Sequence, residues 1–261
     1  MNYFDNKEKI ISNKFFNDGY FIYNSENKLS FNYIEKLFAK NIQKILDTKK
    51  KINLNYLHNY ISIKDLNNFR LTLISYLNKD RQFRFHYFNI ARNSLYILAG
   101  NELMMQKNIN LSIQFPNDES SLLPIHSDVW SGDSPYEINL WVPLVNCYRT
   151  KSMYILTPKY NNNFNKIMKK KKFLSNKKIY NLVKKKIKWL KIDRGSYLLF
   201  NQSLPHGNVV NLEKQTRVSM NCRFKNLFSP YGDKKIGEFF TPITTRAITE
   251  LGMDYQYPFN L

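Results

Sequence analysis

The feature of this sequence that most constrains its fold is a change in hydrophobic periodicity near residue 105. Before that point, apolar residues recur at helical spacing, and in residues 30–49 they place Ile34, Leu37, Phe38 and Ile45 on one helical face. Residues 64–78 and 82–98 also predict helices. After that point, short segments rich in β-branched and aromatic residues are bounded by Pro, Asn, Asp and Gly, as strands are. The predicted strands are residues 110–115, 138–145, 152–158, 195–201 and 215–224.

Two further segments complete this pattern. FFNDGYFIYNSEN, residues 15–27, predicts a short strand ended by turn residues. Residues 166–191 lie between the third and fourth strands of the core and hold 12 lysines and no acidic residue. Their apolar residues are spaced to form a stripe, so we expect one amphipathic helix that exposes its lysines. The stripe consists of Ile179, Leu182, Val183, Ile187 and Leu190.

The chain therefore predicts an α+β arrangement of helices followed by a β-sandwich or barrel with one helical insertion. No internal repeat and no Pro/Gly/Ser-rich linker marks a boundary, and 261 residues suit one domain with elaborations. We expect a single domain over residues 1–261. Within it, residues 1–105 are mainly helical, 106–230 form the β core with an insertion at 160–191, and 231–261 form a C-terminal extension.

The net charge of +20 raises the question of a polyanionic partner. The segment 166–191 carries 12 of the 40 basic residues, and the other 28 stand against 20 acidic residues, a net charge of +8. Most of the excess is thus local. These lysines lack the interleaved aromatic residues of a nucleic-acid surface, so we expect a solvated basic face and no nucleic-acid partner.

Other classes of protein are disfavoured by composition. Two cysteines, Cys147 and Cys222, cannot form a disulfide framework or a Cys-type zinc site, and their apolar surroundings predict buried free thiols. The first residues hold no signal-peptide stretch, and nowhere do 18 apolar residues run together, so no transmembrane segment is expected. A reducing cytoplasm is the expected location. A homo-oligomer is compatible with the sequence.

Three residues have the spacing of a metal site. His126 and Asp128 stand two apart at a predicted strand end, where residues i and i+2 point to the same side. His206 follows another apolar strand some eighty residues later. Two imidazoles and one carboxylate form the ligand set of non-haem Fe(II) oxygenases, which leaves positions for a bidentate co-substrate and O₂. The other two histidines, His58 and His86, lack such surroundings, and we expect structural or surface roles for them.

A second motif agrees with the first. Arg217 comes eleven residues after His206, and Arg217 and Ser219 alternate on one face of a predicted strand. A guanidinium binds a carboxylate bidentately even where water is largely excluded. The combination predicts a site for a dicarboxylate that bridges the metal and Arg217.

The sequence also resembles the Fe(II)/2-oxoglutarate dioxygenases, especially the phytanoyl-CoA dioxygenase-like branch. Within that branch it is most similar to oxygenases of bacterial carbohydrate clusters related to a streptomycin-biosynthesis protein. The likeness covers roughly residues 85–255 and rests on four segments. These are HSDVWSGDSPYEINLWVPLVNCYRTKSMYILTP, LLFNQSLPHGNVVN, TRVSMNCRFKNLFSPYG and GEFFTPIT.

The resemblance implies a double-stranded β-helix, a jelly-roll or cupin-like core. It implies that His126, Asp128 and His206 bind Fe(II), and that Arg217, helped by Ser219, binds the distal carboxylate of 2-oxoglutarate. Asp at position 128 is similar to hydroxylating members and differs from halogenating ones.

Four polar residues around these motifs are further candidates. Gln114 and Lys151 are candidate co-substrate contacts, and Tyr136 and Glu137 are candidate substrate contacts. For each of the four, a structural role is an equally good interpretation.

The implied activity is hydroxylation or desaturation of a small molecule, such as a sugar, an aminocyclitol or a nucleotide-sugar. A phosphate-bearing substrate would be attracted by Lys169 to Lys172 and Lys184 to Lys186 if the insertion lies near the pocket mouth. Three alternatives stay open. They are an Fe(II) oxidase that uses no 2-oxoglutarate, a cupin-like sugar isomerase or epimerase, and a non-enzymatic basic protein that binds nucleic acid or a membrane surface.

Overall fold

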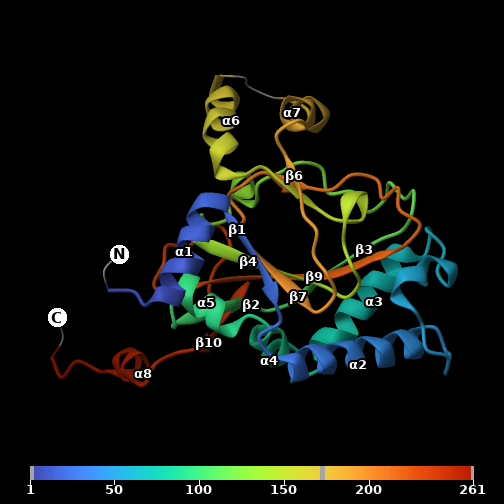
Figure 1. The fold of residues 1–261 in the computed structure, drawn as a ribbon. Coiled ribbons are helices and arrows are strands. Elements are labelled where there is room, and N and C mark those ends of the chain that lie inside the picture. The colour runs from blue at the N-terminus through green and yellow to red at the C-terminus, as the bar shows by residue number, and fades with distance from the viewer. Residues whose placement is uncertain (1–2, 171–173, 260–261) are drawn as a thin grey trace.

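The computed structural model describes residues 3–170 and 174–259 and places a layer of helices against a pair of β-sheets (Figure 1). The helices are α1 (Asn6–Asp18), α2 (Lys28–Ile45), α3 (Leu66–Lys79), α4 (Phe83–Asn89), α5 (Arg92–Ala99), α6 (Pro158–Lys170), α7 (Asn176–Val183) and α8 (Ala247–Asp254). The strands are β1 (Tyr20–Asn24), β2 (Leu103–Gln106), β3 (Asn110–Gln114), β4 (Glu137–Pro143), β5 (Tyr154–Ile155), β6 (Lys188–Trp189), β7 (Ser196–Asn201), β8 (His206–Gly207), β9 (Arg217–Asn226) and β10 (Phe240–Thr244). Short 3₁₀ helices occupy Leu54–Asn59, Asp128–Ser131 and Arg149–Lys151.

The strands form two antiparallel sheets. The large sheet has the order β1-β7-β4-β9-β2-β10, with β3 also paired to β9. The small sheet has the order β6-β5-β8, and an antiparallel bridge between His126 and His206 extends it beyond β8. Along the chain, the core strands pass between the sheets, so that β3, β4, β7 and β9 lie in one and residue 126, β5, β6 and β8 in the other. This is the double-stranded β-helix, the jelly-roll and cupin-like core predicted from the sequence.

Strand β9 shows how the large sheet separates two environments. Its residues Val218, Met220, Cys222 and Phe224 belong to the main hydrophobic cluster. The alternating residues Arg217, Ser219, Asn221, Arg223 and Lys225 therefore project from the opposite face, because successive strand residues point to opposite sides. The neighbouring strand β4 alternates in the same way, with Ile138, Leu140 and Val142 in the cluster. One face of the sheet is thus apolar and the other is polar.

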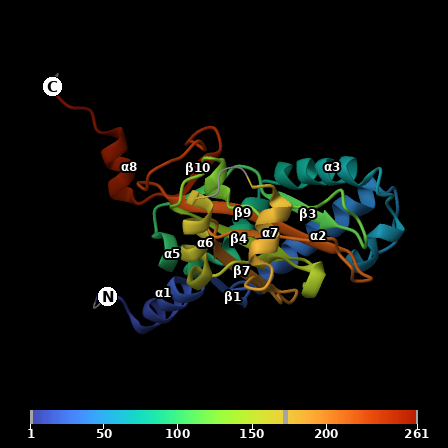
Figure 2. The ribbon, with the colours of Figure 1, turned by 90° about the horizontal axis from the view of Figure 1, so that it is seen from above.

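The N-terminal helices cover the apolar face (Figures 1 and 2). Buried residues of α2, α3 and α4, such as Phe38, Leu73 and Tyr87, share one cluster with the strand residues. Tyr87 is fully buried and its hydroxyl donates to the carbonyl of Leu140 at 2.7 Å, which ties α4 to β4. The helical layer leaves the polar face for the site described below.

Most predicted elements are present, with instructive differences at the N-terminus. The predicted face of α2 is confirmed, because Ile34 and Phe38 are buried and Leu37 and Ile45 pack against the same cluster. Residues 15–18, however, belong to α1 and not to a strand. Helix α1 begins with a capping box between Asp5 and Glu8 and ends at Gly19, whose φ of 73° suits only glycine well.

The insertion differs from the single predicted helix. It contains α6 and α7, followed by the short strand β6. Ile179 and Val183 are buried and Ile187 is half-buried, as predicted, but Leu182 is 40% exposed and Leu190 lies beyond the helix in a different cluster. The predicted strand 152–158 shrinks to β5, because Pro158 starts α6, and proline is favoured at a first helical position. Lys171 and Lys172 lie outside the described residues.

Two expectations about composition can also be examined. Both cysteines are free and buried, as predicted, and burial raises the pKa of each thiol to about 12. Such thiols are unreactive at neutral pH. Among the described helices, none is long and apolar enough to cross a membrane.

The predicted helix 82–98 is broken into α4 and α5 because Glu26 caps the second helix from a distant part of the chain. The N-cap residue of α5 is Ala91, whose side chain cannot accept a hydrogen bond from the first amides of the helix. Instead, the carboxylate of Glu26 accepts from the amides of Asn93 and Ser94 at 2.7 and 3.0 Å and from the hydroxyl of Tyr197 at 3.1 Å. One side chain thereby joins the first loop, α5 and β7.

Replacing this remote cap should destabilise the protein. We expect Glu26→Ala to lower the free energy of unfolding by about 1–3 kcal/mol, because it leaves buried donors without an acceptor. Urea denaturation measures the change. Glu238→Ala removes an exposed glutamate that forms no side-chain hydrogen bond or ion pair with a described residue, so the free energy of unfolding should stay within about 0.5 kcal/mol of that of the unaltered protein. Equal effects of the two substitutions would contradict the capping role.

Candidate metal centre

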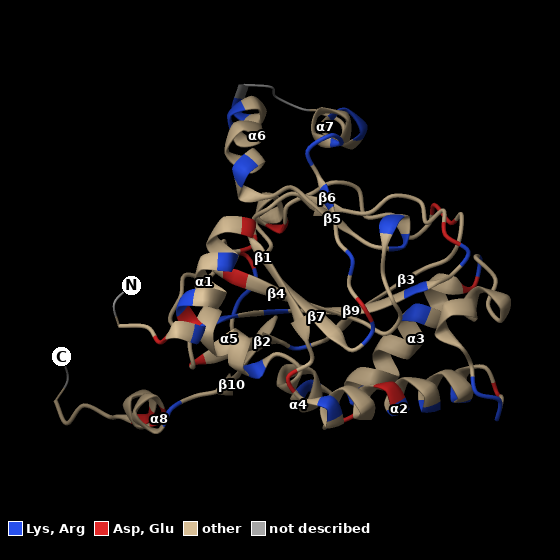
Figure 3. Ribbon diagram, in the orientation of Figure 1, with Lys and Arg blue, Asp and Glu red and all other residues tan. Residues whose placement is uncertain are grey.

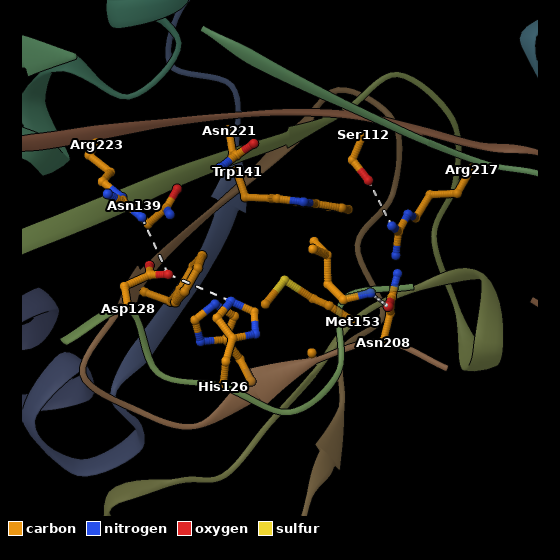
Figure 4. Close-up of a pocket in the computed structure, with 14 residues that line it drawn as sticks. Ser112, His126, Asp128, Asn139, Trp141, Met153, Asn208, Arg217, Asn221 and Arg223 are labelled. Atoms are coloured by element: carbon orange, nitrogen blue, oxygen red, sulfur yellow. Dashed lines mark hydrogen bonds and ion pairs between the residues drawn. The ribbon is translucent and has the colours of Figure 1, made fainter. Parts of the chain in front are cut away.

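His126, Asp128 and His206 lie together on the small-sheet side of the space between the sheets (Figure 4). One ligand atom from each lies within 4.8 Å of the others, and Nε2 of His126 is 3.6 Å from Oδ1 of Asp128. The two histidines face each other across the bridge that their backbones form, with N–O distances of 2.9 and 2.8 Å. The backbone amide of Asp128 donates to the carbonyl of Gln202, which fixes the third residue beside them.

Both imidazoles are oriented by backbone carbonyls. Nδ1 of His126 donates to the carbonyl of Pro124 and Nδ1 of His206 to that of Leu204, each at 2.8 Å. A carbonyl only accepts, so each Nδ1 carries the hydrogen and each Nε2 presents its lone pair. Metal-binding histidines commonly donate their other ring N–H to a carbonyl in this way, which fixes the tautomer and the orientation of the ring.

The electrostatics also suit a cation. Burial, and then the neighbouring His126, lower the pKa of His206 to about 4, so its imidazole is neutral at neutral pH. Oδ2 of Asp128 is buried and has no hydrogen-bond partner among the described residues. Neutral imidazole nitrogens and an unpaired carboxylate oxygen are the donors that a divalent transition metal requires.

These residues line a cavity of about 560 Å³, counting the part open to solvent. The cavity reaches from the three candidate ligands to Arg217 on β9 and is closed by side chains of both sheets. Besides those four residues its walls include Ser112, Asn139, Trp141, Met153, Asn221 and Arg223.

Arg217 is a buried cation that lines this cavity without an anionic partner. Its side chain donates to the carbonyl of Ser152 at 3.3 Å and to Oγ of Ser112 at 2.9 Å, and Nε has no partner among the described residues. The residue is 3% exposed, and burial lowers its pKa to about 10, so it stays charged at neutral pH. No carboxylate in the described part of the chain lies within 4 Å of it. An uncompensated buried charge is costly, so the site is arranged for an anion.

Ser219 and Gln114 lie next to Arg217 but do not line the cavity. Ser219 is fully buried and its Oγ has no partner among the described residues, as Arg217 Nε has none. Gln114 pairs with Arg217 across β3 and β9, and its Nε2 donates to the carbonyl of Val209 at 2.6 Å. Ser219 therefore has unused hydrogen-bonding capacity, whereas the amide nitrogen of Gln114 is occupied.

The other three candidates lie outside the cavity. Lys151 is fully buried, but its Nζ donates to Asn55 at 2.7 Å and to Gln215 at 2.9 Å. Glu137 is buried and accepts from Nε2 of Gln202 at 2.8 Å, and burial raises its pKa. Tyr136 is 60% exposed. The side chains of Lys151, Glu137 and Tyr136 therefore do not line the cavity that contains the candidate metal ligands and Arg217.

Arg223 was missed from the sequence, although it lines the cavity beside the candidate metal ligands. Its guanidinium lies 3.4 Å from Oδ1 of Asp128 and 2.8 Å from Oδ2 of Asp133, so it bridges two aspartates. The alternation of polar residues in TRVSMNCRF could have revealed it, because Arg217, Ser219, Asn221 and Arg223 share one strand face.

A polar wall was missed as well. Asn139 and Trp141 on β4 and Asn221 on β9 line the cavity, and their side chains make no hydrogen bond within the described ranges. Asn139 is only 3% exposed and its Oδ1 is buried. Groups of this kind can bind hydroxyl or carbonyl groups of a bound small molecule.

The position of the His-x-Asp motif differs from the prediction. It does not end a regular strand. His126 forms only a bridge, after a loop of some ten residues, and Asp128 starts a 3₁₀ helix. The backbone of His126 still runs antiparallel to His206, so the two side chains converge as expected. The structure brings the three predicted residues together, but through a local geometry that differs from the predicted strand end.

His58 and His86 have structural surroundings. Nδ1 of His58 lies 2.8 Å from Oγ1 of Thr216. His86 stacks on Tyr33, with ring centroids 3.9 Å apart, and lies 3.1 Å from Oγ of Ser30. Neither belongs to the candidate metal centre.

Comparison with known proteins identifies solved structures of similar fold. No protein-family model matches the sequence, and no curated protein matches it significantly. Many solved structures are similar in fold, and three of them illustrate the likeness. The non-heme monooxygenase ThoJ, in a nickel complex, shares 12% identity at a TM-score of 0.56, over 92% of this chain and 85% of that one. The non-heme alpha ketoglutarate dependent carbocyclase SnoK from nogalamycin biosynthesis shares 9% at 0.54, over 93% and 98%. EctD from S. alaskensis, with bound Fe, shares 13% at 0.52, over 85% and 78%.

The metal centre can be tested without any turnover. We expect the protein, after treatment with a chelator, to bind one Co(II) per chain with visible d–d absorption. His206→Ala and Asp128→Ala should each weaken binding at least 100-fold, because each removes one of three ligands. His86→Ala is the matched control and should bind Co(II) normally. Unchanged binding in His206→Ala would contradict the assignment.

Proposed function

We propose that this chain is an Fe(II)- and 2-oxoglutarate-dependent oxygenase that acts on a small molecule. The observation that carries the proposal is the buried, unpaired guanidinium of Arg217 in the same cavity as His126, Asp128 and His206. A metal site alone would suit several chemistries. A metal site that shares a cavity with a buried arginine suited to bind an anion is compatible with a carboxylate co-substrate.

The residues have separate roles in this proposal. His126, Asp128 and His206 would hold Fe(II), which leaves open positions for the keto acid end of 2-oxoglutarate and for O₂. Arg217 would bind the far carboxylate, with Ser112 holding the guanidinium in place and Ser219 offering a hydroxyl. Iron, 2-oxoglutarate and O₂ together supply an oxidant able to remove hydrogen from a C–H bond. The chain itself supplies orientation and excludes water.

Arg223 would act on the metal ligand and not on the co-substrate. It contacts Oδ1 of Asp128, which restrains the carboxylate and leaves Oδ2 without a partner. Asp133 offsets the positive charge of Arg223. Lys151 and Glu137 have their polar atoms engaged elsewhere, and Gln114 has its amide nitrogen engaged while its buried Oε1 has no partner among the described residues. We assign all three supporting roles around the site.

The reaction and substrate are proposed more broadly. Resemblance to the phytanoyl-CoA dioxygenase-like oxygenases of carbohydrate clusters supports a sugar, aminocyclitol or nucleotide-sugar. The unpaired amides of Asn139 and Asn221 are compatible with such a hydroxylated ring. We propose hydroxylation as the simplest reaction. Desaturation and ring closure are both alternatives, and the structurally similar SnoK is a carbocyclase.

The alternatives differ in what they consume. An Fe(II) oxidase without 2-oxoglutarate would use Arg217 for its substrate and would release no succinate. A cupin-like isomerase or epimerase would turn over without O₂. A non-enzymatic basic protein would bind DNA or RNA with steep salt dependence, and His126→Ala would leave that binding unchanged.

Turnover of 2-oxoglutarate tests the proposed role of Arg217. With Fe(II) and O₂, the protein should release CO₂ slowly from 1-¹⁴C-labelled 2-oxoglutarate and form succinate. Arg217→Ala should raise the KM for 2-oxoglutarate at least tenfold, because it removes a buried charge-assisted hydrogen bond pair. Arg81→Ala, an exposed arginine, should not change it. Iron-dependent oxygen consumption without succinate would favour the oxidase.

A second prediction concerns the lysines of the insertion. Residues of α6 and α7 share a hydrophobic cluster with Ile125, which adjoins His126, and Phe164 of α6 lies 6.1 Å from Trp130 between ring centroids. These helices therefore stand over the loop that bears two candidate ligands, and Figure 3 shows their basic residues. We propose that these lysines attract a phosphate-bearing substrate.

The lysines can be tested with sugars and their phosphates. Sugar phosphates or nucleotide-sugars should stimulate succinate formation more than the free sugars. Changing Lys184, Lys185 and Lys186 to Gln should raise their KM several-fold and flatten its salt dependence, with kcat unchanged. The same change at Lys49, Lys50 and Lys51, an exposed run elsewhere, is the control. Equal stimulation by free sugars, unaffected by the triple variant, would refute the phosphate preference.

A further inference from the structure

Helix α8 and the residues after it form an arm that leaves the body of the protein (Figures 1 and 2). This arm, residues 247–259, includes no buried residue. Its large apolar side chains are exposed, among them Ile248 at 76%, Leu251 at 69% and Tyr255 at 59%. Exposed apolar surface of this density marks an interaction site.

The arm is amphipathic. Ile248 and Leu251, spaced i, i+3, share one face of α8, and Tyr255 follows directly after the helix. Glu250 and Asp254, spaced i, i+4, lie on another face. An eight-residue helix without a buried side chain is marginal in water. Packing against another protein surface would explain both the exposed apolar face of α8 and its helical form.

The arm is also acidic in a basic protein. It carries two carboxylates and no Lys or Arg, whereas the whole chain has a net charge of +20. Neither Glu250 nor Asp254 forms an ion pair within the described ranges. A second copy of this chain is consequently an electrostatically favourable partner for the arm.

A groove of complementary character lies near the root of the arm. This arginine groove has a volume of about 710 Å³, counting the part open to solvent, and is lined by Arg84, Phe85, Phe88, Arg92 and Met105, with the end of β10 as its far wall. Phe85 is 56% exposed. The guanidinium of Arg92 lies over the rings of Phe88 and Tyr96, at 5.8 and 5.5 Å, and forms no ion pair with a described residue. Nε of Arg84 is buried and has no partner among the described residues.

The arm is held away from the groove of its own chain. Glu102 accepts from the backbone amide of Arg246 at 3.0 Å and from Oγ1 of Thr249 at 2.6 Å, which fixes the direction in which α8 starts. β10 itself forms a wall of the groove, so α8 would have to reverse at once to enter it. A copy related by a two-fold axis can supply its arm without that reversal.

We propose that the protein forms a homodimer in which each arm packs into the arginine groove of the other copy. Ile248, Leu251 and Tyr255 contact Phe85 and Phe88, and the carboxylates of Glu250 and Asp254 pair with Arg84 and Arg92. This exchange is independent of the proposed oxygenase activity, since the groove lies on the helical side of the large sheet.

Sedimentation equilibrium of the full chain tests the assembly. We expect a dimer at micromolar concentration, and Leu251→Asp should raise its dissociation constant at least tenfold. Leu29→Asp is the matched control, because Leu29 is 80% exposed on α2, and it should leave the dimer intact. Arg92→Glu should weaken the dimer, and the added changes Glu250→Arg and Asp254→Arg should restore it. A monomer at all concentrations, or equal loss in both leucine variants, would overturn the proposal.

Photocross-linking identifies the occupant of the groove. A benzoyl-phenylalanine at position 255, in an equal mixture of ¹⁵N-labelled and unlabelled chains, should cross-link to peptides of residues 83–98 with mixed isotopic masses. Cross-links within single chains only would show that the arm folds back and would refute the exchange. Co(II) binding, measured in parallel, should be unaffected by the arm variants, which separates this result from any failure of the metal centre.

Discussion

The antiparallel bridge between His126 and His206 is the contact on which the rest of the site depends. Two backbone hydrogen bonds, at 2.9 and 2.8 Å, align segments that are eighty residues apart in the sequence. The carbonyls of Pro124 and Leu204 then turn both rings so that Nε2 faces the cavity. The two candidate imidazole ligands are therefore positioned by backbone groups, whereas the carboxylate of Asp128 is contacted by the side chain of Arg223. Preorganisation of this kind reduces the reorganisation needed when a metal binds.

Strand β9 supplies the second half of the site. Its apolar residues pack against the helical layer, so its alternating polar residues must point to the opposite face of the sheet. Arg217 and Arg223, six residues apart, consequently line the same cavity but differ in their partners. Arg223 has two aspartates within ion-pairing distance, whereas Arg217 has only neutral oxygen atoms. This difference supports our proposal that Arg223 positions the candidate metal ligand Asp128 and that Arg217 binds an external anion.

The sequence was sufficient for the parts of the molecule that depend on periodicity. The strands β3, β4, β7 and β9, and the metal and arginine motifs, follow from alternation and spacing. It was insufficient where a distant residue decides the local structure. Glu26 starts α5 from another part of the chain, and Lys151 is occupied by Asn55 and Gln215. The break in the insertion and the loop around His126 likewise depend on tertiary packing, which no local pattern encodes.

We propose that 2-oxoglutarate binds between the metal and Arg217. The most direct test of this proposal is anaerobic addition of Fe(II) and 2-oxoglutarate to the metal-free protein, followed by visible absorption. Chelation of the metal by the keto acid gives a weak charge-transfer band. We expect this band in the unaltered protein, its absence in His206→Ala, and its appearance only at much higher 2-oxoglutarate concentration in Arg217→Ala. Tight iron binding with no band at any 2-oxoglutarate concentration would contradict the account.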